Sequence, residues 1–342
     1  MLWAISGGAG FLGLHLSRRL ANSHTVRTLD LAPLDEPSLE GRVDELRGDI
    51  RDPACARELV AGASILVHAA AALPISGARD EIRSVNVAGT ATLLAAALEA
   101  RVRRVVFIST TAVYGIPETH PIDESSPLHG VGHYGRSKIE AEDVLREFQR
   151  RGLAAVVIRP KTFIGPERLG VFEILFDWVR EGRRIYVLGS GRNRYQLLAV
   201  EDLVEAIVLA GTASVAGDTL NVGAEDFGTV RSDLEQLIAH AGSDSRVTPV
   251  PARAAEAALR ALELARLSPL AEWHYKTAHR DSCVAVDKAK RLLGWQPRFS
   301  NAEALIQTYD WYLANRGRMA AAGTTHRVPW NQRALAVLKR IS

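Results

Sequence analysis

A tyrosine and a lysine, Tyr134 and Lys138, stand four positions apart in the segment HYGRSK. On an α-helix this spacing puts both side chains on one face, about one turn apart. A phenol has a pKa near ~10, and a cation beside it favours the phenolate that proton transfer requires. The pair is therefore a candidate acid–base centre. The alternative is a solvated helix that carries both residues without a chemical role.

A glycine-rich turn near the N-terminus predicts a dinucleotide site. Gly7, Gly10 and Gly13 lie between a short apolar run and a helical pattern, in the segment SGGAGFLG. Such a turn lets the backbone approach a pyrophosphate, whose charge the helix N-terminus stabilises. Asp30 follows about 20 residues later, where a carboxylate accepts hydrogen bonds from the adenosine ribose. Leu31 comes next where an Arg would favour a 2′-phosphate, so the sequence predicts NAD in preference to NADP.

Two further segments extend this predicted cofactor site. GDIRD ends a third strand, and HAA ends a fourth strand with small residues that leave room for the cofactor. His68 has no partner at metal-ligand spacing, so a packed, hydrogen-bonded role is its default interpretation. The predicted cofactor-binding residues are Gly7, Gly10, Phe11, Leu12, Gly13, Asp30, Leu31, Asp49, Ile50, His68, Ala69, Ala70, Tyr134, Lys138 and Pro160.

The alternation of short apolar runs with helical patterns predicts the fold. Buried parallel strands are expected where Val and Ile gather, at residues 2–6, 25–30, 64–70, 104–109 and 154–159. Helices are expected between them, at residues 11–21, 53–61, 80–100 and 133–151. This order predicts an α/β protein with a doubly wound parallel sheet of the Rossmann type and ligands at the carboxyl ends of its strands.

After residue 164 the pattern changes to helices mixed with short strands. We expect an NAD-binding domain at residues 1–164, to which residues 195–211 return, and a smaller, mainly substrate-binding α/β region at residues 165–315. Residues 316–342 form a basic tail, because no Asp or Glu occurs after Asp310. Its amphipathic pattern predicts a helix docked on the protein's own surface or on a dimer mate. The alternative is weak contact with an anionic membrane surface.

The chain is balanced in charge and poor in cysteine. Its 342 residues include 42 Lys and Arg against 39 Asp and Glu, a net charge of +3, so no nucleic-acid partner is expected. The two cysteines, Cys55 and Cys283, lack metal-ligand spacing, so no metal site is expected and a reducing compartment fits. The sequence begins without a signal-peptide pattern and has no apolar run long enough to span a bilayer. These features predict a soluble, cytoplasmic protein.

Nine motifs occur in a characteristic order: GGAGFLG, DIRD, HAAA, NVAGT, ISTTAVYG, YGRSK, RPKTFIGP, AVEDLVEA and LLGWQP. Through them the chain, from residue 2 to about residue 313, resembles the extended short-chain dehydrogenases/reductases, in the branch called the NAD-dependent epimerase/dehydratase family. The resemblance implies that Tyr134 is the general acid/base, that Lys138 activates it, and that Thr110 orients the substrate oxygen. Together with the glycine turn, Thr110 favours catalysis over the solvated-helix interpretation.

Departures from the family pattern narrow the reaction. Thr111 and Ala112 stand where sugar 4,6-dehydratases carry Asp-Glu and where decarboxylating members use a carboxylate, so neither reaction is expected by that route. Reversible hydride transfer remains. The first expectation is a nucleotide-sugar epimerase that works through a transient keto intermediate. The residues expected to contact its substrate are Thr111, Lys161, Thr162, Arg192, Arg194 and Asn221. For Lys161 the alternative is packing with the ammonium in solvent, and for Asn221 a structural role in its turn is equally open.

Two alternatives stay open. An Ala-rich helix expected at residues 251–267, followed by SPL and LLGWQP, resembles the layout of the family's 3β-hydroxysteroid and related ketone-reductase branches. An NAD-dependent dehydrogenase or ketone reductase acting on a steroid-like or other lipophilic substrate is therefore the second interpretation. A non-catalytic NAD-binding scaffold is the third. The resemblance also implies a homodimer, with the helices at residues 80–100 and 133–151 forming a four-helix bundle.

Overall fold

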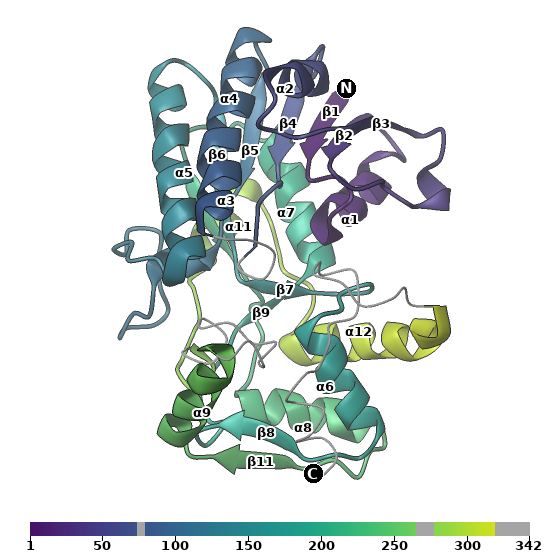
Figure 1. The fold of residues 1–342 in the computed structure, drawn as a ribbon, viewed down its shortest axis with the longest axis vertical. Helices are drawn as coiled ribbons and strands as arrows, with labels where there is room; N and C mark the ends of the chain where they lie inside the picture. The colour runs from purple at the N-terminus through teal and green to yellow at the C-terminus, as the bar shows by residue number, and fades with distance from the viewer. Residues whose placement is uncertain (74–78, 265–276, 319–342) are drawn as a thin grey trace.

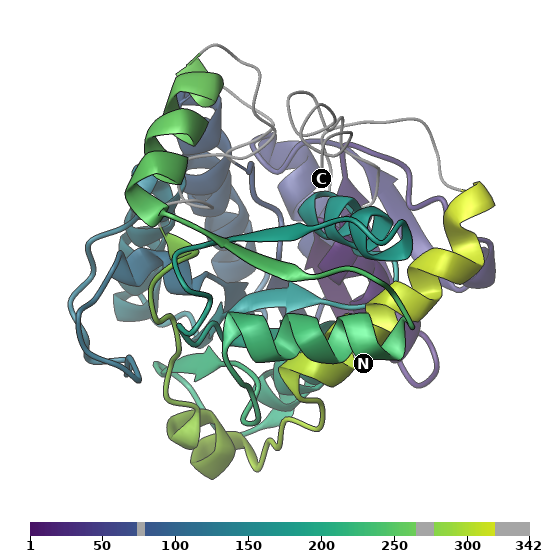
Figure 2. The ribbon, with the colours of Figure 1, turned by 90° about the horizontal axis from the view of Figure 1, so that it is seen from below.

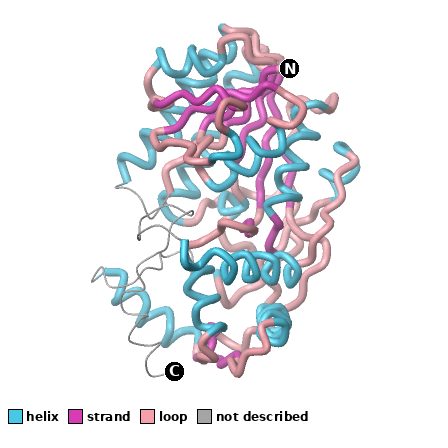
Figure 3. Tube along the Cα trace, turned by 90° about the vertical axis from the view of Figure 1, so that its right-hand side faces the viewer, coloured by secondary structure: helices cyan, strands magenta, loops and turns pink. Residues whose placement is uncertain are grey.

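The computed structural model describes residues 1–73, 79–264 and 277–318. Two layers of structure lie one above the other, and the N-terminus lies in the upper one (Figure 1). Figure 3 shows most strands gathered in that upper part, while helices predominate below. The basic tail beyond Arg318, with its expected surface or membrane contact, lies outside the described residues. Among the described helices, none combines the length and apolar character needed to cross a membrane.

A seven-stranded parallel sheet forms the upper layer, in the order β10-β6-β5-β4-β1-β2-β3. Its strands are β1 (Leu2–Ser6), β2 (Thr25–Asp30), β3 (Val43–Arg47), β4 (Ile65–His68), β5 (Arg104–Ile108), β6 (Ala155–Pro160) and β10 (Thr219–Val222). The order reverses between β1 and β4, which is where an open α/β sheet forms its binding crevice. The predicted doubly wound fold is confirmed.

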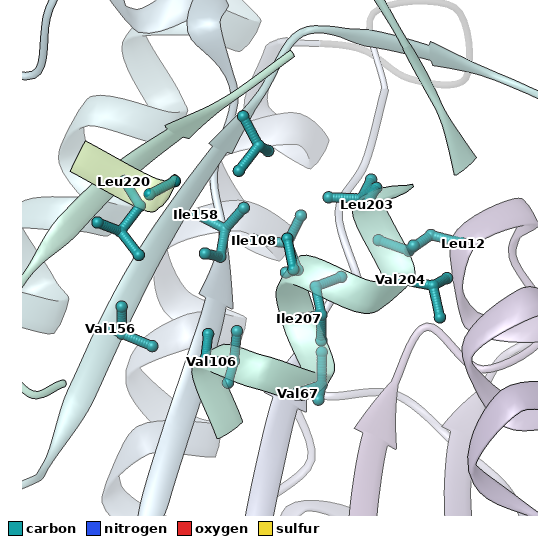
Figure 4. Close-up of a cluster of buried hydrophobic side chains, with 14 of the residues drawn as sticks. Leu12, Val67, Val106, Ile108, Val156, Ile158, Leu203, Val204, Ile207 and Leu220 are labelled. Atoms are coloured by element: carbon teal, nitrogen blue, oxygen red, sulfur yellow. The ribbon is translucent and has the colours of Figure 1, made fainter. Parts of the chain in front are cut away.

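Helices cover both faces of the sheet. One face carries α1 (Phe11–Leu20), α7 (Val200–Thr212) and α11 (Asp287–Leu293), whose apolar residues share one core with the strands. In Figure 4 the α7 side chain Ile207 lies among the sheet side chains Val67, Val106 and Ile108, while Val204 lies beside Leu12 of α1. The other face carries α2 (Pro53–Val60), α4 (Thr90–Glu99) and α5 (Gly132–Arg150). The helix expected at residues 80–100 is continuous, and consists of α3 (Arg79–Arg83), the π-helical η2 (Ser84–Gly89) and α4.

The lower layer is smaller and mostly helical, and Figure 2 views it from below. It contains α6 (Val171–Arg180), α8 (Val230–His240), α9 (Ala252–Leu264), α12 (Asn301–Asn315) and the parallel pair β8 (Ile185–Leu188) and β11 (Val247–Val250). The aromatic rings of Phe176, Tyr309 and Tyr312 pack together in its core. A two-stranded sheet of β7 (Thr162–Ile164) and β9 (Leu197–Ala199) lies between the layers (Figure 1). The remaining short helices are η1 (Pro37–Leu39), η3 (Thr111–Tyr114) and η4 (Arg316–Arg318).

The chain crosses between the layers more often than the sequence predicts. Besides α7, two later segments belong to the upper layer: β10 pairs with β6, and α11 joins the core beneath it. Both lie within residues 165–315, which the sequence assigns to the substrate-binding region. A strand of four residues carries no local signal of the sheet it will join, because that choice depends on the partner strand.

Candidate active site

The glycine turn between β1 and α1 is tightly packed. Gly7 has a φ of +79°, and a Cβ there would lie 2.7 Å from the backbone nitrogen of Ala70. A Cβ on Gly13 would lie 2.2 Å from the carbonyl oxygen of Gly7. The first turn of α1, which begins at Phe11, carries no acidic residue and no side-chain cap. The turn therefore fits a pyrophosphate, because the backbone approaches closely and the helix N-terminus is positively polarised.

Asp30 links this turn to the segment that follows β2. Its carboxylate accepts hydrogen bonds from the backbone N–H of Ala9 at 3.0 Å and of Ala32 at 3.1 Å. The side chain is half-buried, whereas the adjacent Leu31 is 64% exposed. A carboxylate held this way keeps acceptor sites for a ribose. The arrangement therefore fits the predicted adenosine end of the cofactor site.

Asp49 and Ile50 play mostly local roles. The guanidinium of Arg51 bonds both carboxylate oxygens of Asp49, and it holds the pKa of Asp49 below its usual range. Ile50 is buried, and its Cδ1 would lie 2.7 Å from a Cβ on Gly89. Ile50 is therefore held in the core, so the predicted contact with the adenine would fall to Asp49, whose carboxylate is paired with Arg51.

His68 ties three elements together. Ser6 Oγ lies 2.7 Å from its Nδ1, and Thr90 Oγ1 lies 2.8 Å from its Nε2. Thr90 already donates its hydroxyl proton to the carbonyl of Asn86, so it accepts from Nε2, and Ser6 donates to Nδ1. Burial, together with the charge of Lys138, lowers the pKa of His68 to about 3. His68 is therefore a neutral, structural residue beneath the half-buried pair Ala69 and Ala70.

Tyr134 and Lys138 lie in the first two turns of α5. Lys138 is buried, and its Nζ donates to the carbonyl of Ile108 at 2.8 Å and lies 4.4 Å from the ring centre of Phe107. Burial lowers the pKa of Lys138 to about 8, and Glu142 opposes that fall. Burial raises the pKa of Tyr134 to about 12, and a nearby guanidinium, Arg168, opposes that rise. The phenol is therefore protonated until further positive charge arrives beside it.

Thr110 directly follows β5, and its segment packs against the start of α5. Its Oγ1 accepts from the backbone N–H of Ala112 at 3.2 Å, which caps η3. The backbone N–H of Val131 donates to the carbonyl of Ala112, and a Cβ on Gly135 would lie 2.8 Å from the same oxygen. The hydroxyl, the phenol and the ammonium thus come from adjoining segments at the carboxyl ends of β5 and β6. Pro160 ends β6 there.

A buried polar network behind this centre escaped the sequence analysis. Glu142 is 1% exposed and accepts from Arg159 at 2.6 and 2.9 Å and from Ser109 Oγ at 2.5 Å. Arg159 also donates to the hydroxyl of Tyr114, which donates to Asn221 Oδ1, both at 2.8 Å. The spacing of four residues between Lys138 and Glu142 was the available signal, because it puts the carboxylate on the face of α5 that carries the lysine.

Asn221 lies in the core and not at the surface of the site. Its side chain is fully buried, and its Nδ2 donates to the carbonyl of Ile122 at 3.3 Å while its Oδ1 is engaged by Tyr114. This favours the structural role that the sequence left open, because the LNVG turn belongs to β10, and β10 enters the main sheet beside β6. A strand in that place turns the amide inward.

Lys161 stands just past the end of β6 and is 4% exposed. Its Nζ donates to Ser282 Oγ at 2.6 Å and lies 5.0 Å from the ring centre of Tyr195. Thr162 Oγ1 lies 3.3 Å from the hydroxyl of the same tyrosine. Among the described residues no carboxylate lies within ion-pair distance of Lys161, and burial lowers its pKa to about 8. The structure therefore groups Lys161 and Thr162 around Tyr195.

Arg194 approaches this group from the neighbouring segment. Its backbone N–H donates to Asp281 at 2.8 Å, and its Nε lies 3.6 Å from the same carboxylate in an exposed pair. Burial raises the pKa of the Cys283 thiol, and Arg194 and Lys161 both oppose that rise, so both cations lie near one residue. Arg192 is exposed, and Thr111 is half-buried in η3. No described contact joins Arg192 to the rest of the site.

Arg168 is a second residue that the sequence analysis missed. It is 8% exposed, and its Cζ lies 5.3 Å from the ring centre of Phe11 and 5.4 Å from that of Phe163. Its Nε has no hydrogen-bond partner among the described residues. Burial lowers the pKa of Arg168 to about 9, and Tyr134 opposes that fall. The available sequence signal was its position in GPERLG, just after the RPKTFIGP motif that contains β7.

The sheet, the glycine turn and the paired tyrosine and lysine define a Rossmann-type dinucleotide-binding enzyme. A model of the NAD dependent epimerase/dehydratase family matches residues 3–223, and the chain belongs to that family. NAD is accordingly its cofactor.

Individual proteins of several activities are similar to the chain. The protein y4nG of Sinorhizobium fredii is 36% identical over 340 residues, which cover 98% of this chain and 84% of y4nG. A 4-hydroxy-2-methyl-3-oxo-4-farnesyl-3,4-dihydroquinoline-1-oxide ketoreductase of Stigmatella aurantiaca is 29% identical over 92% of this chain and 98% of its own.

Two solved structures share the fold. The UDP-glucose 4-epimerase of Thermotoga maritima, determined with UDP-glucose, aligns with a TM-score of 0.78 at 24% identity over 92% of this chain and 100% of its own. The dTDP-glucose 4,6-dehydratase DesIV of Streptomyces venezuelae, determined with NAD, aligns with a TM-score of 0.76 at 26% identity over 93% of this chain and 98% of its own. A dehydratase is thus among the proteins similar to this chain. The comparisons therefore do not support the expectation that the chain does not catalyse dehydration.

Proposed function

We propose that the protein is a nucleotide-sugar epimerase that works through a transient ketone. The observation that carries the proposal is Lys161, a buried ammonium without a carboxylate partner among the described residues. It stands past the end of β6, beside the strand whose end carries Thr110. A buried charge without a partner is costly, so an anionic ligand group is expected to neutralise it. Arg194 lies near Cys283, as Lys161 does, and adds a second cation suited to a diphosphate.

The residues of the catalytic centre take distinct roles in this proposal. NAD, when bound, supplies the acceptor and later donor of the electron pair that leaves the substrate carbon. Tyr134 takes the proton of the substrate hydroxyl as the ketone forms and returns it when the hydroxyl is restored on the opposite face. The Lys138 ammonium stabilises the phenolate, and the Thr110 hydroxyl orients the substrate oxygen. The glycine turn and Asp30 hold the cofactor at its pyrophosphate and ribose.

Epimerisation is preferred over dehydration because of two residues. Thr111 and Ala112 occupy the turn after Thr110, and neither side chain can remove a proton from carbon. Elimination of water needs such a base as well as an acid for the leaving hydroxyl. Epimerisation needs only the acid–base centre already present.

Ligand binding and turnover test the proposal. We expect UDP- or dTDP-sugars to raise the melting temperature of the NAD-loaded protein, and one of them to be converted to its epimer without net change in NADH absorbance. No stabilisation by any nucleotide diphosphate, together with NADH consumption on ketones, would reject the epimerase. Formation of a 4-keto-6-deoxy product would show dehydration instead.

A ketone reductase is the second candidate, because the 29% identical Stigmatella protein is named as a ketoreductase. In that case Lys161 would bind another polar group of the substrate. Steady NADH oxidation with a lipophilic ketone, and no effect of nucleotide sugars on melting, would favour it.

A cytoplasmic homodimer also remains a proposal. The apolar residues of α4 and α5 that could serve a four-helix bundle, Leu93, Leu94 and Leu145, are fully buried within the single chain, so they form ordinary core. A dimer would have to use the outer faces of these helices. Sedimentation of the protein as a monomer at micromolar concentration would remove the dimer.

A further inference from the structure

Arg168 is an incompletely paired cation inside the crevice. It is 8% exposed, its Nε donates to no described residue, and no described carboxylate lies within ion-pair distance of it. The rings of Phe11 and Phe163, which stack on each other with centres 5.7 Å apart, lie beside it, and Tyr134 is near enough to oppose the fall of its pKa. Aromatic faces attract a guanidinium but accept none of its five N–H groups in ordinary hydrogen bonds. The geometry therefore calls for an acceptor that comes from a ligand.

The loop that carries Arg168 is docked on α1. His15 Nε2 lies 3.0 Å from the carbonyl oxygen of Pro166, and Arg18 forms an ion pair of 2.5 Å with Glu167. Glu167 has a φ of +71°, a conformation that is strained for a residue with a side chain. Two contacts and a strained turn thus hold the residue next to Arg168 against the helix that opens at the glycine turn.

Two independent features meet at the start of α1. The helix N-terminus is uncapped and has no acidic residue in its first turn, so it is suited to a phosphate. The buried guanidinium of Arg168 lies over Phe11, the first residue of that helix. Lys161 instead donates to Ser282, and Arg194 pairs with Asp281 in the neighbouring segment. The position of Arg168 at α1 therefore favours the cofactor's diphosphate over the substrate's.

We infer that Arg168 binds the pyrophosphate of NAD, so that the cofactor is held by the glycine turn and by a cation on the loop after β7. Planar N–H groups pair well with phosphate oxygens, and burial strengthens the interaction. A nucleotide sugar carries the same diphosphate chemistry, so the test must separate the two ligands.

Isothermal titration of the nucleotide-free protein with NAD, ADP-ribose, adenosine and UDP provides that separation. We expect Arg168→Gln to weaken NAD and ADP-ribose about tenfold to a hundredfold, because both carry the pyrophosphate. Adenosine and UDP should bind as they do to the unchanged protein. Arg168→Lys should recover part of the loss, since an ammonium supplies charge without the planar fork.

The matched control is Arg19→Gln, which removes the same charge from α1 at an exposed position paired with Glu205. It should leave all four affinities unchanged. Weakened UDP with unchanged NAD would overturn the inference and assign Arg168 to the substrate, and four unchanged affinities would overturn it as well. Should Arg168→Gln not fold, Arg168→Lys decides: tighter or equal NAD binding rejects the inference, and weaker binding of NAD and ADP-ribose alone supports it.

Discussion

The two sides of the crevice compensate their buried cations differently. On the cofactor side, Lys138 donates to the carbonyl of Ile108, and Glu142 is near enough to oppose the fall of its pKa. On the substrate side, Lys161 is as deeply buried, but its described neighbours are the Ser282 hydroxyl, the Tyr195 ring and Cys283, and no described carboxylate pairs with it. Lys138 is therefore compensated within the protein. The second side needs an anion, so the stability of the protein and the binding of its ligands should be coupled there.

The largest effect is expected on turnover, when the acid–base residue of the catalytic centre is replaced. Tyr134→Phe removes the proton-carrying group and keeps the ring, so turnover should fall about 10²–10⁴-fold while NAD affinity stays within a few-fold. Steady-state rates and NAD titration measure the two quantities. Tyr186→Phe, a half-buried tyrosine in β8, is the control and should retain full activity. Retained turnover in Tyr134→Phe would remove the acid–base assignment.

The second-largest effect is expected on stability, when the carboxylate that pairs with a buried cation is removed. Glu142→Gln leaves the buried guanidinium of Arg159 without its counter-charge, and the free energy of unfolding should fall by roughly 3–5 kcal/mol. Glu140→Gln removes the same charge two residues away on α5, where it pairs with the exposed Arg83, and should cost under about 1 kcal/mol. Urea denaturation compares them. Equal losses would show that the network does not stabilise the cofactor side.

Replacing Lys161 should raise the free energy of unfolding, the opposite of the loss expected for Glu142→Gln. Its pKa of about 8 in the folded chain lies below the ordinary value of 10.5, so between these pH values the unfolded chain holds a proton that the folded chain has released. The stability of the unchanged protein should therefore rise as pH increases through this window. Lys161→Met should reduce that rise, to which Lys138 contributes over the same pH window, and should stabilise the protein at pH 7 by roughly 1–3 kcal/mol.

The matched control for this change is Lys288→Met, which removes an ammonium from a surface pair with Asp218 at 3.0 Å. It should change the free energy of unfolding by under about 1 kcal/mol, both at pH 7 and above that window. Lys161→Met should also weaken the binding of the anionic substrate. A destabilised Lys161→Met variant at pH 7 would mean that the lysine is compensated by a group other than a ligand.

The smallest effect on stability is expected at the exposed pair of Arg194 and Asp281. Arg194→Gln and Asp281→Asn should each cost under about 1 kcal/mol, because solvent screens the pair. Only Arg194→Gln should weaken UDP, by about tenfold, if the cation serves the substrate's diphosphate. Equal UDP affinities in the two variants would remove Arg194 from the site.

The cofactor side could be predicted from the sequence because its signals are local. A strand, a glycine turn and a helix follow one another within the first 20 residues, and Asp30 ends the next strand. The spacing between Tyr134 and Lys138 needs only a helix to put both on one face. Parallel pairing then brings the strand ends to one edge, which places Thr110 beside them.

Tertiary structure alone decided the surroundings of Asn221, Lys161 and Arg168. Asn221 became a core residue because β10 joined the sheet beside β6, and nothing within four residues specifies that choice. Arg168 and Lys161 became unpaired buried cations because their neighbours, Phe11 and Ser282, come from distant parts of the chain. The sequence determined which residues can carry charge or protons. The packing of elements far apart in the chain decided which of those charges are compensated, because burial and pairing are properties of the assembled surroundings.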